Sequence, residues 1–176
     1  NFLILSFYPL TGTVSDVAMQ GESLLVIADG QLQAFNVKGN WISPIALNQT
    51  VSGKASIAYN NAEEALDIQP FVNDFVVLRK ESAVFIDNIS TSEMLVEVAT
   101  QIALHDPVAL VQSADRLFVS TESGQLLSFD SEGQVLRHGT FTVADRLLAY
   151  APYLVAINNH GIQLWDVTNP YTVSLV

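Results

Sequence analysis

The apolar residues of this chain gather in short runs separated by polar or turn-forming residues. In four places a run rich in Val, Leu, Ile and Phe meets a turn of Gly, Asn, Asp or Ser, and a second run follows. These places are residues 24–36, 75–87, 117–130 and 154–166. Paired runs around such turns predict four β-hairpins.

The flanks of the hairpins repeat as well. Another apolar stretch precedes each hairpin, and a turn and a further strand follow it. The unit is therefore a four-stranded antiparallel meander that recurs roughly every 40 residues, which is typical of β-propeller blades. The inner strands are apolar almost without interruption, as expected for a sheet packed on both faces.

The predicted fold is all-β, with four consecutive blades in a single domain or fragment. The blades cover approximately residues 13–47, 63–98, 106–141 and 142–176, and residues 48–62 form a polar insertion loop. Residues 1–10 supply one strand of a preceding blade. This extra strand favours part of a larger ring of seven or eight blades, with closure of the four blades on themselves as the alternative.

Two stretches resemble a known repeat family. Residues 16–30 look like the start of an LVIVD-type propeller repeat, and residues 161–170 match the family's Gly-apolar-x-apolar-apolar-Asp-Val-Thr-Asn-Pro ending. The third hairpin, 117–130, is closer to the repeats of quinoprotein-like propellers. The resemblance implies a propeller of the kind often found in bacterial surface or exported proteins. It implies no catalytic residue, and nothing in the chain marks a quinone site or another cofactor.

The composition and charge of the chain exclude several classes of protein and of partner. Hydrophobic residues make up 49% of the chain and charged residues 14%, which excludes general disorder. No apolar run is long enough to cross a membrane as a helix. The 18 acidic residues outnumber 7 scattered basic ones, so neither nucleic acid nor an anionic membrane surface is an expected partner. The absence of cysteine excludes disulfides, thiolate catalysis and cysteine-based zinc sites.

The histidines give no clear catalytic or metal motif. His105, His138 and His160 lack the spacing of a helix-borne zinc site. His105 and Asp106, with Ser113, invite comparison with a catalytic triad, but the chain has no Gly-x-Ser-x-Gly nucleophile elbow. We therefore assign no catalytic residue and no metal ligand.

An acidic or amide residue follows the third strand of every unit. The four residues are Asn36, Asp87, Asp130 and Asp166. Such residues commonly cap the next turn by accepting backbone hydrogen bonds, and we prefer this interpretation to a set of ligands.

Three further aspartates are the candidate ligand-binding residues. Asp16, Asp67 and Asp145 each lie eight or nine residues ahead of a hairpin, in or near a predicted first strand. First strands line the channel of a propeller, so these acids are expected to gather at one mouth of it. The alternative is that each carboxylate accepts a local backbone hydrogen bond. A hard cation needs six to eight oxygen ligands, so we expect no tightly held metal.

The leading hypothesis is a non-enzymatic interaction or structural scaffold in an exported or surface protein. Its partner would be another protein, and the chain would belong to a larger chain or assembly. The expected location is extracellular, at the cell surface or in the periplasm. The alternative is a propeller that binds a small ligand or a cation in its channel, including an enzyme of hydrolase type.

Overall fold

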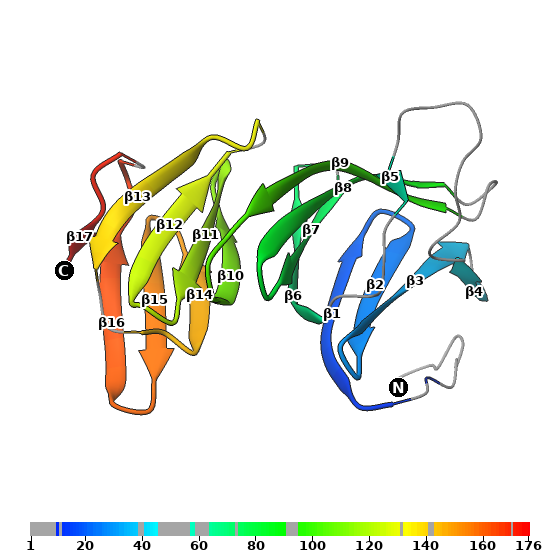
Figure 1. Ribbon diagram of the computed structural model, residues 1–176, viewed down its shortest axis with the longest axis horizontal. Coiled ribbons are helices and arrows are strands. Elements are labelled where there is room, and N and C mark those ends of the chain that lie inside the picture. The colour runs from blue at the N-terminus through cyan, green and yellow to red at the C-terminus, as the bar shows by residue number, and fades with distance from the viewer. Residues whose placement is uncertain are drawn as a thin grey trace, which may run out of the picture. The chain divides into compact units, whose positions relative to one another are not determined.

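The computed structural model describes residue 10 and residues 12–38, 41–45, 57–58, 64–72, 74–90, 95–130, 132–140, 143–169 and 171–176. Within these ranges every regular element is a β-strand, and no helix is long and apolar enough to cross a membrane. The strands form four antiparallel sheets (Figure 1). The predicted all-β fold of consecutive meanders is therefore confirmed.

The first sheet is a meander of four strands in chain order. Its strands are β1 (Val14–Gln20), β2 (Ser23–Ala28), β3 (Gln31–Lys38) and β4 (Trp41–Ile45). Pro44 lies in β4 and cannot donate a ladder hydrogen bond, which suits the edge position of this strand. The predicted strand within residues 1–10 lies almost wholly outside the described residues.

The second sheet has five strands in the order β5-β9-β8-β7-β6. They are β5 (Ile57–Ala58), β6 (Ala65–Phe71), β7 (Asp74–Arg79), β8 (Ser82–Ser90) and β9 (Leu95–Ala103). The short β5 comes from the predicted insertion loop 48–62, whose other residues lie outside the described ranges. It pairs with β9, which continues to Ala103, beyond the predicted blade end at 98.

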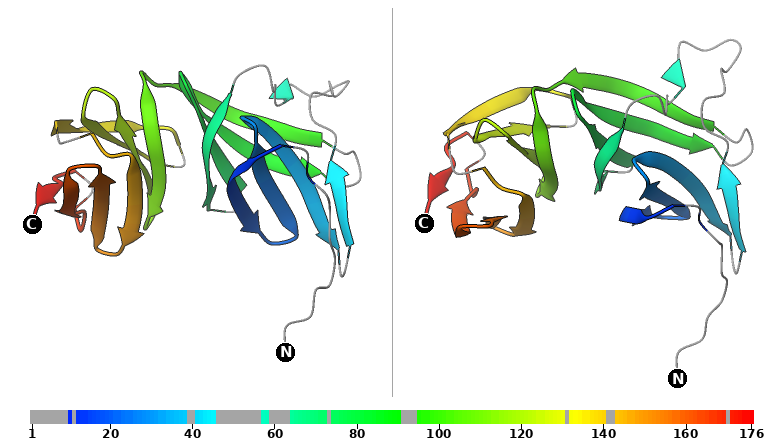
Figure 2. Two further views of the ribbon diagram at one scale, coloured as in Figure 1. Left: turned by 90° about the horizontal axis from the view of Figure 1, so that it is seen from below. Right: turned by 60° about the horizontal axis from the view of Figure 1, so that its bottom comes forward.

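The third and fourth sheets are again meanders. The third contains β10 (Pro107–Ser113), β11 (Arg116–Thr121), β12 (Gln125–Phe129) and β13 (Val135–Thr140). The fourth contains β14 (Arg146–Tyr150), β15 (Tyr153–Asn158), β16 (Gly161–Asp166) and β17 (Ser174–Leu175), in orange to red in Figure 2. The last strand is shorter than the stretch 171–176 from which it was expected.

The hairpins share one register. The corresponding cross-strand pairs are Leu24 with Phe35, Leu117 with Phe129, and Leu154 with Trp165. The large apolar residue before the Asp or Asn therefore occupies the same position in these three sheets. Phe35 and Phe129 are fully buried, whereas Trp165 is only partly buried.

The turn between β2 and β3 requires a glycine. Gly30 has φ +73°, a left-handed conformation that glycine adopts without steric penalty. A Cβ at this position would lie 2.7 Å from Cγ of Glu64, and the Gly30 carbonyl accepts a hydrogen bond from the Ala65 N–H at 2.8 Å. The turn is thus held closely against the start of β6.

The chain divides into two compact units, each with a core of its own. The first comprises residues 1–77 and 84–101, and the second residues 78–83 and 102–176. We call the face of a sheet that packs on the following sheet its front face, and the face that packs on the preceding sheet its rear face.

The first core joins the front face of the first sheet to the rear face of the second. Its residues are Ala18, Leu25, Ile27, Leu32, Ala34, Ala65, Ile68, Phe75, Val77, Val84 and Ile86. The second core joins the front face of the third sheet to the rear face of the fourth in the same way. Its buried residues are Ala109, Val111, Phe118, Leu126, Ala144, Leu147, Leu154, Ala156 and Val167. In both cores the first strands of the two sheets are in contact, β1 with β6 and β10 with β14.

Candidate functional site

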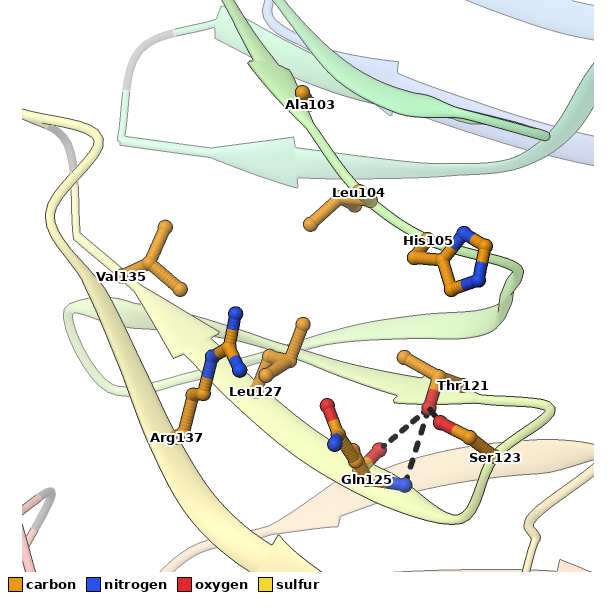
Figure 3. A pocket seen from close by; sticks show the side chains of 9 residues that line it. All are labelled: Ala103, Leu104, His105, Thr121, Ser123, Gln125, Leu127, Val135 and Arg137. Carbon is orange, nitrogen blue, oxygen red and sulfur yellow. Dashed lines mark hydrogen bonds between the residues drawn. The ribbon is translucent and has the colours of Figure 1, made fainter.

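A cavity of about 710 Å³ opens beside the third sheet, within the second unit (Figure 3). The connection from β9 to β10 forms one side of it, and β11, β12 and β13 form the other. Its lining residues are Ala103, Leu104, His105, Thr121, Ser123, Gln125, Leu127, Val135 and Arg137.

Hydrogen bonds fix the polar side of the cavity. Thr121 ends β11, and its Oγ1 accepts a hydrogen bond from the N–H of Gln125 at 3.1 Å and lies 2.9 Å from Oγ of Ser123. The Gly124 N–H donates to the Thr121 carbonyl at 2.9 Å and closes the same turn. The hydroxyl and amide groups on this side are therefore positioned before any ligand arrives.

A backbone hydrogen bond anchors the connection from β9 to β10. The Leu104 N–H donates to the carbonyl of Glu81 at 2.8 Å. The adjacent His105 places Nε2 3.3 Å from a carboxylate oxygen of Asp106, with 94% and 54% of the two side chains exposed. A pair so exposed contributes little to stability, and the imidazole stands at the rim of the cavity.

Apolar and cationic groups complete the lining. Leu127 is buried, and Val135 and Arg137 lie on the neighbouring strand β13 (Figure 3). No carboxylate is among the described residues that line the cavity. The arrangement can hold an apolar group against Leu127 and Val135 while the Arg137 guanidinium pairs with a carboxylate.

Asp16, the first predicted ligand, bonds to the backbone. Its Oδ1 accepts a hydrogen bond from the N–H of Val17, and its Oδ2 accepts one from the N–H of Ile68, both at 2.9 Å. The second bond runs from β1 of the first sheet to β6 of the second. For Asp16 the structure thus shows the backbone-capping alternative.

Asp67 lies next to this contact on β6. Its carboxylate accepts a long hydrogen bond of 3.4 Å from Nε2 of Gln69. Because Asp16 bonds to Ile68, the residue beside Asp67, the structure brings these two predicted residues to neighbouring first strands of one unit.

Asp145 does not occupy the position of Asp16, so the expected equivalence of the aspartates is wrong for this residue. Asp16 pairs with Ile27, and the residue that pairs with the corresponding Ile157 is Arg146. Asp145 precedes β14 and donates its backbone N–H to the Ile157 carbonyl at 2.9 Å. Asp145 lies nine residues ahead of its hairpin whereas Asp16 lies eight, and this one-residue difference places Asp145 just before the position equivalent to Asp16.

Two of the four residues that follow third strands cap turns, as predicted. Asp130 Oδ1 accepts hydrogen bonds from the N–H groups of Glu132 and Gln134 at 3.0 and 2.9 Å. Asp166 Oδ1 accepts one from the Thr168 N–H at 2.8 Å, and hydrogen bonds from the Thr168 side chain and backbone lower the pKa of Asp166. The other two, Asn36 and Asp87, lie within β3 and β8 rather than after them, and their side chains lie outside the described residues.

Ser113 does not join His105 and Asp106, so the three residues compared with a catalytic triad do not form one. Asp106 directly precedes β10, whereas Ser113 ends that strand and is buried there. The length of the strand separates them by about 20 Å. In the part of the chain that is described, no three acidic or histidine side chains form a group suited to a metal ion.

A buried polar cluster in the third sheet was not predicted. Arg116 Nε donates to Ser128 Oγ at 3.0 Å, and its Nη2 donates to the Gln134 carbonyl at 3.1 Å. Ser128 Oγ also lies 2.6 Å from Nε2 of His138, and Arg116 Nη1 lies 3.5 Å from Oδ2 of Asp130. Burial lowers the pKa of His138 below its ordinary value of 6.5, and the charge of Arg116 lowers it further.

The members of this cluster are scattered over four strands or turns, so no local sequence motif predicts the cluster. The signal in the sequence was an arginine and a serine inside otherwise apolar runs. A buried arginine needs hydrogen-bond acceptors, and only the register of β11, β12 and β13 identifies them.

Comparison with solved structures identifies the architecture. The chain matches the computationally designed Ika4 protein with a TM-score of 0.63 at 16% identity, covering 94% of this chain and 98% of Ika4. It matches the Pan2 WD40 domain of Neurospora crassa with a TM-score of 0.65 at 16% identity, covering 93% and 49% of the two chains. It also matches PorZ of Porphyromonas gingivalis, a bacterial surface component of the type-IX secretion system. There the TM-score is 0.58 at 11% identity, and the match covers 93% of this chain and 21% of PorZ.

No protein-family model and no curated protein sequence matches the chain. The chain spans the length of the designed protein but about half or less of these two natural ones. At such low identities the likeness concerns the fold alone. Together with the four antiparallel meanders, it shows that the sheets are blades of a β-propeller.

Proposed function

We propose that this chain is a non-enzymatic interaction scaffold of an exported or surface protein, and that the cavity beside the third blade receives a segment of a partner protein. The observation that carries this proposal is the lining of the cavity. An apolar floor, a fixed row of hydroxyl and amide groups and one arginine meet in an open space of about 710 Å³.

The lining defines the chemistry of the partner. Leu127 and Val135 favour an apolar side chain, and Arg137 favours an adjacent carboxylate. The whole chain carries a formal net charge of −11, so a highly acidic partner would be repelled at long range. A mostly uncharged segment with one apolar residue beside one carboxylate fits best, because the arginine then acts only at short range.

The proposed surface location rests on one of the solved structures. The likeness to PorZ, a bacterial surface component, agrees with export. The sequences of residues 16–30 and 161–170 support the further proposal that the first and last blades are LVIVD-type repeats.

Site-specific cross-linking tests the proposal. A photoreactive amino acid in place of Val135 should capture a defined partner, and the same group in place of the exposed Tyr171 should not. The purified partner should then bind Arg137→Gln about tenfold more weakly than the parent chain, because a charge-assisted hydrogen bond is lost. Arg146→Gln, which removes an exposed arginine elsewhere, should leave the affinity unchanged. Equal loss in both variants would leave only a general charge effect and would refute the proposed site.

The alternative, a channel site for a cation or small ligand, has less support. Both carboxylate oxygens of Asp16 accept backbone hydrogen bonds, and Asp145 lies out of register with Asp16. A cation would have to compete with the hydrogen bond that joins the first two blades.

A further inference from the structure

The outer edge of the third blade is open along β13. This strand is the last of its sheet, and no described strand pairs with its far side. In an edge strand every second residue directs its backbone N–H and C=O away from the sheet, where another extended segment can pair with them. β13 therefore offers a row of backbone donors and acceptors beside the cavity that Val135 and Arg137 line.

The second blade shows how such an edge is filled in this protein. β9 is the fourth strand of its blade, as β13 is of the third, and β5 pairs with β9 as a fifth strand (Figure 1). The pairing is antiparallel and places Ile57 opposite Val98 and Ala58 opposite Glu97. The chain itself thus adds a short antiparallel strand to the outer edge of a blade.

The pairing of β13 with β12 limits the length of an added strand. Residues 135–137 pair in an unbroken register with residues 127–129, and the register then shifts before Thr140. Gly139, with φ +91°, lies in the shifted part. Such an irregularity interrupts regular pairing along an edge. An added strand would therefore be short, like β5, and would face residues 135–137.

The side chains of Val135 and Arg137 define the sequence that such a strand would carry. They are two residues apart on one strand, so they point to the same side, and both line the cavity (Figure 3). In an antiparallel pair, the residue opposite Arg137 comes two positions before the residue opposite Val135. Opposite charges and apolar pairs stabilise neighbouring strands. The complementary sequence is thus an acidic residue followed two positions later by an apolar one.

We propose that the partner segment joins the third blade as a fifth strand, antiparallel to residues 135–137, with an acidic residue opposite Arg137 and an apolar residue opposite Val135. This inference rests on the proposed function, because it states how the segment in the cavity is held. Backbone hydrogen bonds to the edge supply affinity, and the two side-chain pairs supply specificity. A single acidic residue suits a chain with a formal net charge of −11.

A tethered peptide tests this inference without knowledge of the partner. The chain has no cysteine, so Glu132→Cys creates a single thiol at an exposed position three residues before β13. The acetylated and amidated peptide Thr-Glu-Thr-Val-Gly-Gly-Cys, joined to this thiol by a disulfide, is held near the edge at an effective concentration of about a millimolar or more. Hydrogen exchange of at least one backbone amide of residues 135–137, followed by NMR, should slow about tenfold or more.

Matched controls separate strand pairing from other contacts. The peptide Thr-Val-Thr-Glu-Gly-Gly-Cys, which reverses the acidic and apolar residues, should slow the exchange less. The original peptide with N-methyl groups on Glu, the second Thr and Val should not slow it, because those residues can no longer donate strand hydrogen bonds. Tyr171→Cys carrying the original peptide at an exposed position elsewhere should leave the exchange of β13 unchanged.

The outcomes distinguish this inference from the proposed function. No slowing with the original peptide would mean that the edge accepts no strand, and the inference would be overturned. Slowing that persists with the N-methylated peptide would refute strand pairing but leave a partner in the cavity. Equal slowing by the original and the reversed peptide would refute the antiparallel order. If the photoreactive group at Val135 captured no partner while the original peptide alone slowed the exchange, the proposed function would fail and the strand-accepting edge would stand.

Discussion

Ser128 Oγ and His138 Nε2 lie 2.6 Å apart in the third blade, and Arg116 Nε donates to the same hydroxyl oxygen from the other side. Because Arg116 already donates to one lone pair of Oγ, the hydroxyl group can donate its own hydrogen bond to His138. The neutral imidazole then accepts a hydrogen bond from this hydroxyl at Nε2, and its ring packs against Phe118 with centroids 5.9 Å apart. A protonated His138 would place a second positive charge beside Arg116.

The first prediction is that acid destabilises the third blade through His138. Its pKa is lower in the folded chain than its ordinary value of 6.5, so the unfolded chain binds the proton more readily. The stabilisation is complete above pH 6.5 and is lost as the pH falls from there toward the folded pKa. Urea unfolding followed by tryptophan fluorescence should show a lower midpoint at about pH 5 than at about pH 7.

The control for this prediction is His138→Leu, which cannot titrate. Its unfolding midpoint should fall less between the same two pH values, although its stability at neutral pH is lower because the Ser128 hydroxyl loses an acceptor. His160→Leu changes an exposed histidine and should keep the pH dependence of the parent. Identical pH dependence in the parent and in His138→Leu would show that His138 does not titrate differently on folding.

The second prediction concerns the shared hairpin position. Phe129→Ala should lower the free energy of unfolding by about 3–5 kcal/mol, because a completely buried ring leaves a cavity. Trp165→Ala should cost less, about 2 kcal/mol, because Trp165 is only partly buried against its core. Tyr171→Ala, at an exposed position, should change it by less than about 0.5 kcal/mol. If Trp165→Ala unfolded at the same urea concentration as the parent, the assigned equivalence of Trp165 and Phe129 would be wrong.

The hairpins illustrate what the sequence could predict. Gly30 stands between two apolar runs, and both the turn and its positive φ follow from that local pattern. The shared position of Phe35, Phe129 and Trp165 follows from equal spacing within each hairpin. Interactions over short sequence distances fix these features, so a single sequence contains the information.

The candidate site was less predictable because its features depend on register between distant segments. Asp145 was grouped with Asp16 although it lies nine residues ahead of its hairpin and Asp16 eight, and the strand pairing shows that this one-residue difference puts Arg146 in the equivalent place. The cavity depends on how the connection after β9 meets β13, which are far apart in sequence. Short-range patterns carry no information about such contacts.

The third prediction tests the close approach at Gly30. Gly30→Ala should lower the free energy of unfolding by about 1–3 kcal/mol, because it places a Cβ in a left-handed conformation and 2.7 Å from Cγ of Glu64. Gly21→Ala is the matched control, since Gly21 has φ +58° but open space around its Cβ position, and it should cost less. The double variant Gly30→Ala with Glu64→Ala should recover the difference between the two single glycine variants. Equal costs at Gly21 and Gly30 would contradict the contact with Glu64.

The last prediction separates the structural role of Asp16 from that of a cation ligand. Asp16→Ala should lower the free energy of unfolding by about 1–3 kcal/mol, because the N–H groups of Val17 and Ile68 lose their acceptor. Calorimetric titration of the parent chain with calcium should show no binding in the micromolar range. Both oxygens of Asp16 are occupied by backbone N–H groups, and a calcium ion needs six to eight oxygen ligands. Asp67→Asn should leave the titration unchanged, whereas micromolar binding that this substitution abolishes would replace the backbone role of these aspartates with a cation site.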